Sequence, residues 1–223
     1  MLETRKLFHQ KINQRQPKQL AASGCTKAAV SLIFRPSHEE RASSEKTQLE
    51  KPQDVKCVKS SFTEFDLLLM QRAYNDADPW SGQISFPGGR FEQSDTSMQT
   101  TAERETKEEI GFCLQTNDYL GQLDDVFGPI VSDKKTIHIS SFFYLLEATP
   151  SVDPNHEVEQ IIWMPLKGLL EANRRVHFAH PSVANVTMQG IRLDALSRDG
   201  EPLILWGLSL YLMEHLFEIL ELE

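Results

Sequence analysis

The stretch Arg104-Glu105-Thr106-Lys107-Glu108-Glu109-Ile110-Gly111, with Phe86-Pro87-Gly88-Gly89-Arg90 upstream, carries the strongest signal in this chain. On a helix, its glutamates Glu105, Glu108 and Glu109 are spaced i, i+3 and i+4, so at about 3.6 residues per turn they share one face. Like charges this close repel one another, and we expect a cation between them. Carboxylate oxygens suit Mg²⁺ or Mn²⁺. The stretch therefore predicts a divalent-metal site, and a metal of this kind suggests phosphate chemistry.

The composition indicates one globular core with an acidic surface. The chain has 223 residues, 40% of them hydrophobic, and its 23 basic and 32 acidic residues give a net charge of −9. This acidic excess argues against nonspecific binding to nucleic acid. No apolar run reaches the ~18 residues of a membrane-spanning helix. We therefore expect neither nucleic acid nor membrane as a partner, and the acidic balance still allows a small phosphorylated substrate held through a metal.

The cysteines give the expected compartment. Cys25, Cys57 and Cys113 are odd in number, and none of them forms a C-x-x-C pair. This pattern predicts neither a disulfide framework nor a zinc site, and it fits a reducing cytoplasm.

Apolar runs and turn residues predict a mixed α/β, or α+β, sandwich in one domain. We expect strands at 28–34, 62–72, 84–86, 119–127, 137–147, 161–164 and 186–193, the first two paired with each other. We expect helices at 4–22, 96–110, 166–172 and 203–222. The predicted organisation is an N-terminal helical tail at 1–24 and a single domain at 25–223, with a loop insertion at 37–60.

Capping residues give the expected ends of the glutamate-bearing helix. Ser94 and Asp95 are candidate N-caps, and Gly111 is a natural C-cap. Asp95 is also a candidate catalytic residue, and the sequence does not decide between the two roles.

Together with its flanks, the opening stretch resembles the Nudix box, whose pattern is G-x5-E-x7-R-E-U-x-E-E-x-G-U, with U a bulky apolar residue. Arg104 to Phe112 matches every fixed position of the second half except Thr106, which stands where U is expected. In the first half, Asp95 replaces the glutamate, and the spacing to Arg104 is one residue longer. The resemblance implies a Nudix fold, with a mixed sheet flanked by the box helix and a C-terminal helix.

Further features resemble the Nudix branch that includes coenzyme A pyrophosphatases. They are the longer spacing with Asp95, the turn Phe86-Pro87-Gly88-Gly89 and the late segment Trp206-Gly207-Leu208-Ser209. The branch also carries a second arginine before the glycine turn, and this chain has none between Arg72 and Gly82. The resemblance covers roughly residues 27–220.

The resemblance implies hydrolysis of a diphosphate (P–O–P) linkage in a nucleoside diphosphate joined to another group, with Mg²⁺ or Mn²⁺. A coenzyme A pyrophosphatase is the narrower alternative. A non-catalytic Nudix-fold module that senses a nucleotide metabolite is the alternative from another class. A homodimer is also compatible with the sequence.

The helix face and the resemblance together assign roles in the site. Glu105 and Glu109 are the predicted direct metal ligands, and Glu108 binds a second ion or orders its water. The resemblance adds the carbonyl of Gly88 as a backbone ligand. Arg104 reaches Glu108 at i+4 and holds its rotamer.

The resemblance places the general base outside the box, on a loop before a late strand. Three neighbouring residues in Asn155-His156-Glu157-Val158-Glu159 are candidates. Glu157 is the first choice, Glu159 the second and His156 the third.

Overall fold

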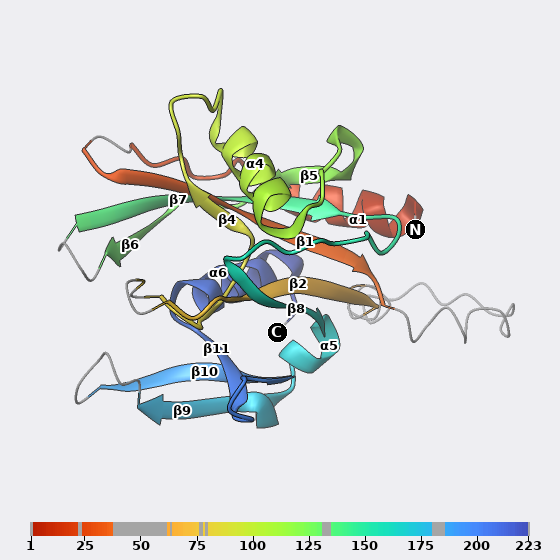
Figure 1. Cartoon of the computed structure of the whole chain (residues 1–223). Helices are drawn as coiled ribbons and strands as arrows, with labels where there is room; N and C mark the ends of the chain where they lie inside the picture. Colours follow the sequence, from red (N-terminus) through yellow and green to blue (C-terminus); the bar gives the residue numbers. More distant parts are fainter. Residues whose placement is uncertain are drawn as a thin grey trace, which may run out of the picture.

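The structure is a computed structural model that describes residues 2–21, 24–37, 62, 64–75, 78, 80–130, 135–179 and 186–222 (Figure 1). The predicted insertion at 37–60 lies outside the described residues except for Ser37. The helices are α1 (Leu2–Asn13), α4 (Met98–Ile110), α5 (Leu166–Leu169) and α6 (Gly207–Leu220). The strands are β1 (Thr26–Pro36), β2 (Phe65–Arg72), β3 (Ile84–Ser85), β4 (Gly88–Arg90), β5 (Tyr119–Gln122), β6 (Val126–Ile130), β7 (Lys135–Leu145), β8 (Val158–Pro165), β9 (Arg175–Ala179), β10 (Thr187–Leu196) and β11 (Pro202–Trp206).

Within the described residues, a mixed sheet of eight strands is built around β1. Strands β1 and β7 run parallel from Thr26↔Ile137 to Phe34↔Leu145, and β2 pairs antiparallel with the C-terminal end of β1. Strand β4 pairs with the N-terminal half of β1 on the same side, through Ala28↔Arg90 and Val30↔Gly88. Strands β2 and β4 therefore share one edge of β1, each pairing with a different part of it. This pairing places the glycine turn beside β1.

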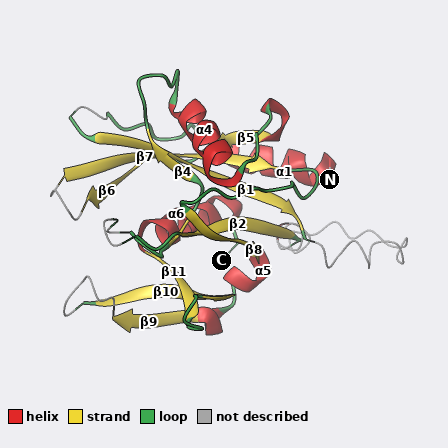
Figure 2. Cartoon of the chain, viewed as in Figure 1, coloured by secondary structure: helices red, strands yellow, loops and turns green. Residues whose placement is uncertain are grey.

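Helices cover both faces of this sheet (Figure 2). On one face, α4 packs through Ala102 and Ile110 against β1 and β7, whose Ile33 and Phe142 belong to the same buried cluster. On the other face, α1 and α6 pack in the larger core. A second sheet, in the order β11-β10-β9, lies beside α6. This α+β arrangement is the mixed sheet between two helical layers that the sequence predicts.

The N-terminal helix is part of the core. Phe8 is fully buried and its ring meets Phe62 and Phe65 edge-on, while Ile12 is 2% exposed. After the helix, Arg15 binds Asp124 at 2.9 Å. The predicted boundary at residue 24 stays a prediction, although α1 packs within the domain that follows it.

Several predicted element boundaries are wrong. The segment 119–127 forms two strands, β5 and β6, which pair with different halves of β7. The segment 203–206 belongs to strand β11, and the terminal helix begins only at Gly207, because Trp206 is extended at φ −151°. The helix expected at 4–22 ends at Asn13, and strand β9 has no counterpart in the prediction.

Within the described residues, no helix combines the length and apolar character that a membrane span requires.

Candidate active site

The glycine turn before α4 is shaped by the strand that it contacts. Gly88 has φ +154°, and a Cβ atom there would lie 2.2 Å from the Ala29 carbonyl oxygen, so only glycine fits. Pro87 accepts a hydrogen bond from the Ser31 N–H at 2.8 Å. These contacts fix the turn against β1 and aim the Gly88 N–H at α4.

Helix α4 presents the glutamates as the sequence predicts, although its N-cap is a different residue. Ser97 is the N-cap, with reciprocal hydrogen bonds to Thr100, so the assignment of Ser94 or Asp95 as the cap is wrong. Gly111 is the C-cap, in the left-handed conformation at φ 70°. Thr106, at the position where the box pattern has an apolar residue, is fully buried and donates to Ser31 Oγ at 2.9 Å.

Glu109 is a buried acid facing the glycine turn. It is 2% exposed, and its Oε2 accepts the Gly88 N–H at 2.8 Å. The pKa of Glu109 is raised to about 8, mainly by burial and in smaller part by the nearby Glu105 and Glu157 carboxylates, while the Gly88 hydrogen bond and Arg72 oppose the shift. In these surroundings the protonated form of Glu109 is favoured at neutral pH, and a nearby cation would favour the charged form.

Glu105 lies against the second glycine of the turn. A Cβ atom on Gly89 would stand 2.4 Å from the Glu105 carboxyl carbon, so this carboxyl occupies the space that a side chain at position 89 would fill. Burial raises the pKa of Glu105, and Glu108 and Glu157 add to the shift, whereas Arg104 opposes it. Two crowded acids therefore meet at one glycine turn.

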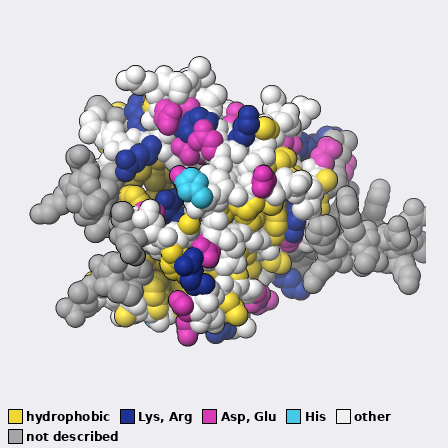
Figure 3. Space-filling model, in the orientation of Figure 1, with side chains coloured by type: hydrophobic (Ala, Val, Ile, Leu, Met, Phe, Trp, Pro, Cys, Tyr) yellow, Lys and Arg dark blue, Asp and Glu magenta, His cyan; other side chains and the backbone are white. Residues whose placement is uncertain are grey.

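Arg104 is the centre of an ion-pair network on the solvent side of these acids. Its guanidinium contacts Glu105 Oε1 and Glu108 Oε2, each at 3.0 Å, and donates to the Arg90 carbonyl at 2.9 Å. The Glu108 side chain is 54% exposed, so of the three glutamates it is the one turned toward solvent. Acidic and basic side chains gather over α4 on this face of the molecule (Figure 3).

Asp95 is the second anchor of Arg104. Its Oδ1 lies 3.0 Å from Arg104 Nε and its Oδ2 lies 3.1 Å from Nη2. These hydrogen bonds lower the pKa of Asp95 to about 2, with further donors at Thr101 and the Glu92 N–H. The residue in the place of the first box glutamate thus holds the arginine.

The loop before β8 is tied to the end of α4. Asn155 N–H donates to the Glu109 carbonyl at 2.8 Å, and Asn155 Oδ1 accepts the Glu157 N–H at 2.8 Å. This tie brings Glu157 close enough to raise the pKa of both Glu105 and Glu109. The second candidate, Glu159, is paired with Arg198 at 2.6 Å, which favours Glu157 over Glu159 as the free carboxylate.

Sequence reasoning did not assign Arg72 to the site, although a lone basic residue at the end of a buried strand is a signal. Arg72 ends β2, and its Nε and Nη2 donate to Asp78 Oδ2 at 3.0 and 2.8 Å. Its charge lowers the pKa of Glu109. The site therefore contains a second arginine, close enough for its charge to act on Glu109.

The chemistry of these residues fits a hard divalent cation. Glu105 and Glu109 offer carboxylate oxygens beside a glycine turn, and their pKa values are raised first by burial and then by neighbouring carboxylates. Side chains of His, Cys, Asp and Glu do not by themselves form a three-membered ligand cluster anywhere in the described ranges. A bound ion would therefore require small adjustments of these carboxylates or additional backbone and water ligands.

Comparison with known proteins decides the family. The NUDIX domain model matches residues 52–185, more than half of the chain. The chain belongs to the Nudix family. The match covers β2 to β9, and therefore includes the glycine turn, the Nudix helix α4 and Glu157.

Relatives of this Nudix chain are of moderate similarity. A Schizosaccharomyces pombe protein, C14C4.10c, is 37% identical over 108 residues, which cover 47% of this chain and 33% of the relative. The human mitochondrial coenzyme A diphosphatase NUDT8 is 27% identical over 147 residues, which cover 62% of this chain and 56% of the relative. The chain thus spans between a third and just over half of the length of these curated relatives.

A solved structure supports the Nudix fold over most of the chain. The MutT/nudix family protein from Enterococcus faecalis superposes with a TM-score of 0.54 at 14% identity, covering 96% of this chain and 72% of that protein. At this identity the likeness concerns the fold alone. It extends beyond the Nudix box to most of the described elements.

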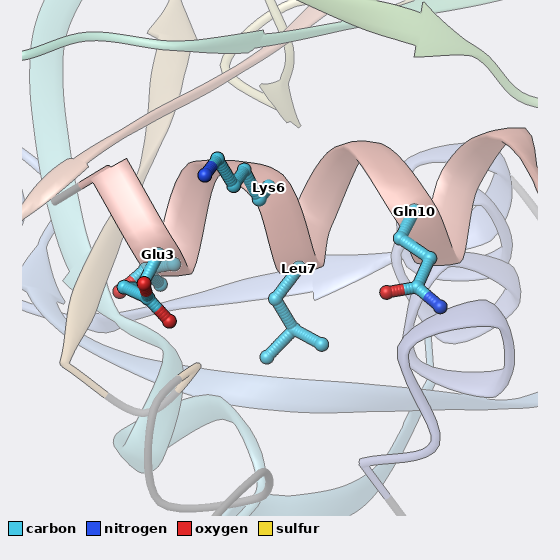
Figure 4. A pocket seen from close by; sticks show the side chains of 5 residues that line it. Glu3, Lys6, Leu7 and Gln10 are labelled. Atoms are coloured by element: carbon cyan, nitrogen blue, oxygen red, sulfur yellow. The ribbon is translucent and has the colours of Figure 1, made fainter.

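One surface hollow lies away from the Nudix box. It has a volume of about 320 Å³, and the described residues that line it, Glu3, Thr4, Lys6, Leu7 and Gln10, all belong to α1 (Figure 4). None of the predicted site residues lines this hollow. We therefore assign it no part in the chemistry at α4.

Proposed function

We propose that this chain hydrolyses the P–O–P linkage of a nucleoside diphosphate joined to another group, with Mg²⁺ or Mn²⁺ as cofactor. The observation that carries the proposal is Glu109, a buried acid whose pKa is raised to about 8 while Glu105 and Glu157 crowd it. A site of this kind is stabilised by a divalent cation, and a diphosphate is the anionic group that such a cation binds in turn.

The proposed metal ligands are Glu105, Glu109 and the carbonyl of Gly88, with Glu108 at a second ion or its water. The glycine turn supports this assignment, because the missing side chain of Gly89 leaves room for the Glu105 carboxylate and the Gly88 N–H donates to Glu109. When bound, the metal supplies Lewis-acid stabilisation of charge developing on phosphate oxygens and lowers the pKa of water. Arg104 keeps Glu105 and Glu108 in position through its two 3.0 Å contacts.

Glu157 is the proposed general base. Its backbone is fixed by Asn155 and by the Ala73 N–H, which donates to the Glu157 carbonyl at 2.7 Å. From this position its carboxylate would take the proton of the attacking water as the water oxygen forms its bond to phosphorus and the P–O bond to the leaving phosphate breaks. Arg72 supports binding of the anionic substrate, because its guanidinium is held by Asp78 beside the acids.

Coenzyme A is the narrower candidate substrate. The relative NUDT8 carries the name coenzyme A diphosphatase, and this chain shares the longer spacing with Asp95 and the late Trp206-Gly207-Leu208-Ser209 segment with that branch. The missing second arginine between Arg72 and Gly82 argues against it. We therefore propose the diphosphate linkage as the substrate class and coenzyme A as one member to test.

The test is phosphate or nucleotide release from coenzyme A, ADP-ribose, NADH, dinucleoside polyphosphates and deoxynucleoside triphosphates, each with Mg²⁺ and with Mn²⁺. We expect turnover of at least one diphosphate compound and loss of that turnover with EDTA. Tight binding of one compound with no turnover of any would replace the enzyme by a nucleotide-sensing module. Cytoplasmic location and homodimer formation stay predictions, which fractionation and light scattering would examine.

Two variants test the residue assignment. Glu109→Gln should lower kcat by roughly two orders of magnitude or more, because it removes a ligand charge, and Glu157→Gln should lower kcat by roughly 10²–10⁴-fold as expected for a general base. Glu103→Gln is the matched control on the same helix, because Glu103 accepts hydrogen bonds from Tyr144 and Gln99 on another face. Near-normal activity of Glu109→Gln would remove the metal assignment.

A further inference from the structure

The turn between β10 and β11 reaches the two segments that flank the site. Its residue Arg198 places its guanidinium carbon 4.0 Å from the centre of the Tyr74 ring and its Nη2 2.6 Å from Glu159 Oε2. Tyr74 follows Arg72 by two residues, and Glu159 follows Glu157 by two residues. One side chain of the β10–β11 turn therefore contacts both the segment after β2 and the start of β8.

A second link runs parallel to the first. Gln160 Nε2 donates to the Leu196 carbonyl at 2.9 Å and to Gln71 Oε1 at 2.7 Å. Gln71 is fully buried, and its own Nε2 donates to Tyr74 Oη at 3.1 Å. The β10–β11 hairpin is thus joined to the same two segments through an interior amide chain as well as through Arg198.

The segment after β2 and the segment before β8 meet beside the proposed base, Glu157. The Ala73 N–H donates to the Glu157 carbonyl at 2.7 Å, and this hydrogen bond joins the residue after Arg72 to the proposed base. Asn155 links the proposed base to α4, because its N–H donates to the Glu109 carbonyl and its Oδ1 accepts the Glu157 N–H, each at 2.8 Å. The relative position of these segments therefore sets where Arg72 and Glu157 lie relative to α4.

We propose that Arg198 is a positioning residue of the active site, which holds the Tyr74 segment against the Glu159 strand and so keeps Glu157 and Arg72 in register with α4. The inference rests on the proposed function for its kinetic consequence. The contacts themselves do not depend on the identity of the substrate. Arg198 acts through its neighbours, because its guanidinium stacks on Tyr74 and pairs with Glu159.

The chain offers a matched control for Arg198. Arg175 on β9 pairs with Glu214 at 2.6 Å, the same distance as Arg198 to Glu159, and both arginine side chains are 52% exposed. Arg175 belongs to the same small sheet, yet its partner lies on α6 and not beside the site. Arg198→Ala and Arg175→Ala therefore each remove a surface ion pair of the same length and exposure, but only the Arg198 pair joins the segments beside the site.

Amide hydrogen exchange tests whether Arg198 holds the two segments together, and it needs no substrate. In Arg198→Ala, the Ala73 amide should exchange at least about tenfold faster, because the segments it joins can separate locally. Arg175→Ala should leave that amide unchanged, and both variants should melt within about 2 °C of the wild type, as expected for surface substitutions. An unchanged Ala73 amide in Arg198→Ala, or an equal change in Arg175→Ala, would overturn the proposal.

Kinetics on the best substrate of the panel separate positioning from direct contact. Arg198→Ala should lower kcat roughly tenfold with KM changed less than about threefold, since misplacement of a catalytic group lowers kcat. Tyr74→Ala should reproduce this loss, and the double variant should be no worse than either single one. Arg198→Lys, which keeps the charge near Glu159, should recover part of kcat.

The outcomes are distinct. A large rise in KM with kcat retained in Arg198→Ala, together with additive losses in the double variant, would make Arg198 a substrate contact and overturn the positioning role. If the wild-type protein turns over no compound of the panel, the proposed function fails, and the exchange rate of the Ala73 amide still decides whether Arg198 makes the tie.

Discussion

Asp95 and Arg104 form a two-pronged ion pair, with Oδ1 3.0 Å from Nε and Oδ2 3.1 Å from Nη2. The Asp95 side chain is 4% exposed, whereas Arg104 continues outward to Glu105 and Glu108. The pair therefore transmits a fixed orientation from the loop before α4 to the two glutamates. Such planar, paired hydrogen bonds between arginine and a carboxylate give geometric specificity as well as energy.

Asp95→Asn should weaken metal-dependent activity without removing any proposed ligand. The amide keeps the shape of the carboxylate, yet its NH2 group replaces one of the two acceptor oxygens and its negative charge is lost. Arg104 therefore keeps at most part of this anchor. We expect roughly a tenfold rise in the Mg²⁺ concentration needed for half-maximal turnover, within the range that second-layer changes produce. Asp95→Glu restores the charge and serves as the control, and an unaltered Mg²⁺ dependence in Asp95→Asn would contradict the role.

Gly89→Ala should inactivate the site through its effect on Glu105. The added methyl group would stand 2.4 Å from the Glu105 carboxyl carbon, so this carboxyl must move. We expect turnover to fall by roughly two orders of magnitude, because a displacement of about 1 Å costs that much. Gly128→Ala is the control, since its Cβ would meet only the Leu208 and Ile137 side chains, at 3.3 and 3.4 Å.

Circular dichroism and thermal melting would show whether the two glycine variants remain folded. Equal activity of Gly89→Ala and the wild type would mean that Glu105 need not occupy the space beside Gly89.

The sequence was sufficient for the parts of the site that depend on local spacing. Glu105, Glu108 and Glu109 share a face because of helix geometry, and the Gly111 cap ends that helix as predicted. Arg104 contacts Glu108 at i+4, also as expected. Local periodicity determines these contacts, so one segment contains all the information they need.

The remaining contacts of the site depend on segments that are far apart in the chain. The Asn155 N–H meets Glu109, and Arg198 meets Tyr74, only because the sheet brings these residues together. The start of α6 was misplaced because Leu203 to Trp206 are as apolar as the helix that follows. Apolar character alone does not separate a buried strand from a helix.

The metal-free protein should be less stable at pH 8 than at pH 5.5. Burial raises the pKa of Glu109 from the ordinary 4.5 to about 8. Between these values the folded protein holds a proton that the unfolded chain has released, so the free energy of unfolding falls as the pH rises through this window. The full effect is on the order of a few kcal/mol. Thermal melting in EDTA at both pH values measures it.

Two comparisons isolate Glu109 in that measurement. Glu109→Gln should reduce the pH dependence, leaving the smaller contribution of Glu105, whose pKa is also raised. Excess Mg²⁺ at pH 8 should raise the melting temperature of the wild type more than that of the variant, because ligands that bind the folded state stabilise it. Equal melting temperatures of the metal-free wild type at pH 5.5 and 8 would contradict the raised pKa.

Phe8→Ala should destabilise the whole domain, because α1 belongs to its core. The Phe8 ring is fully buried, with ring centres 4.5 Å from Phe62 and 5.2 Å from Phe65. Removing it leaves a cavity among aromatic neighbours that cannot close, and such substitutions cost about 3–5 kcal/mol. Urea unfolding measures this loss, with Tyr211→Ala on α6 as the control, since Tyr211 is 54% exposed and should change stability by less than about 1 kcal/mol. A loss below about 1 kcal/mol in Phe8→Ala would show that the domain packs without its N-terminal helix.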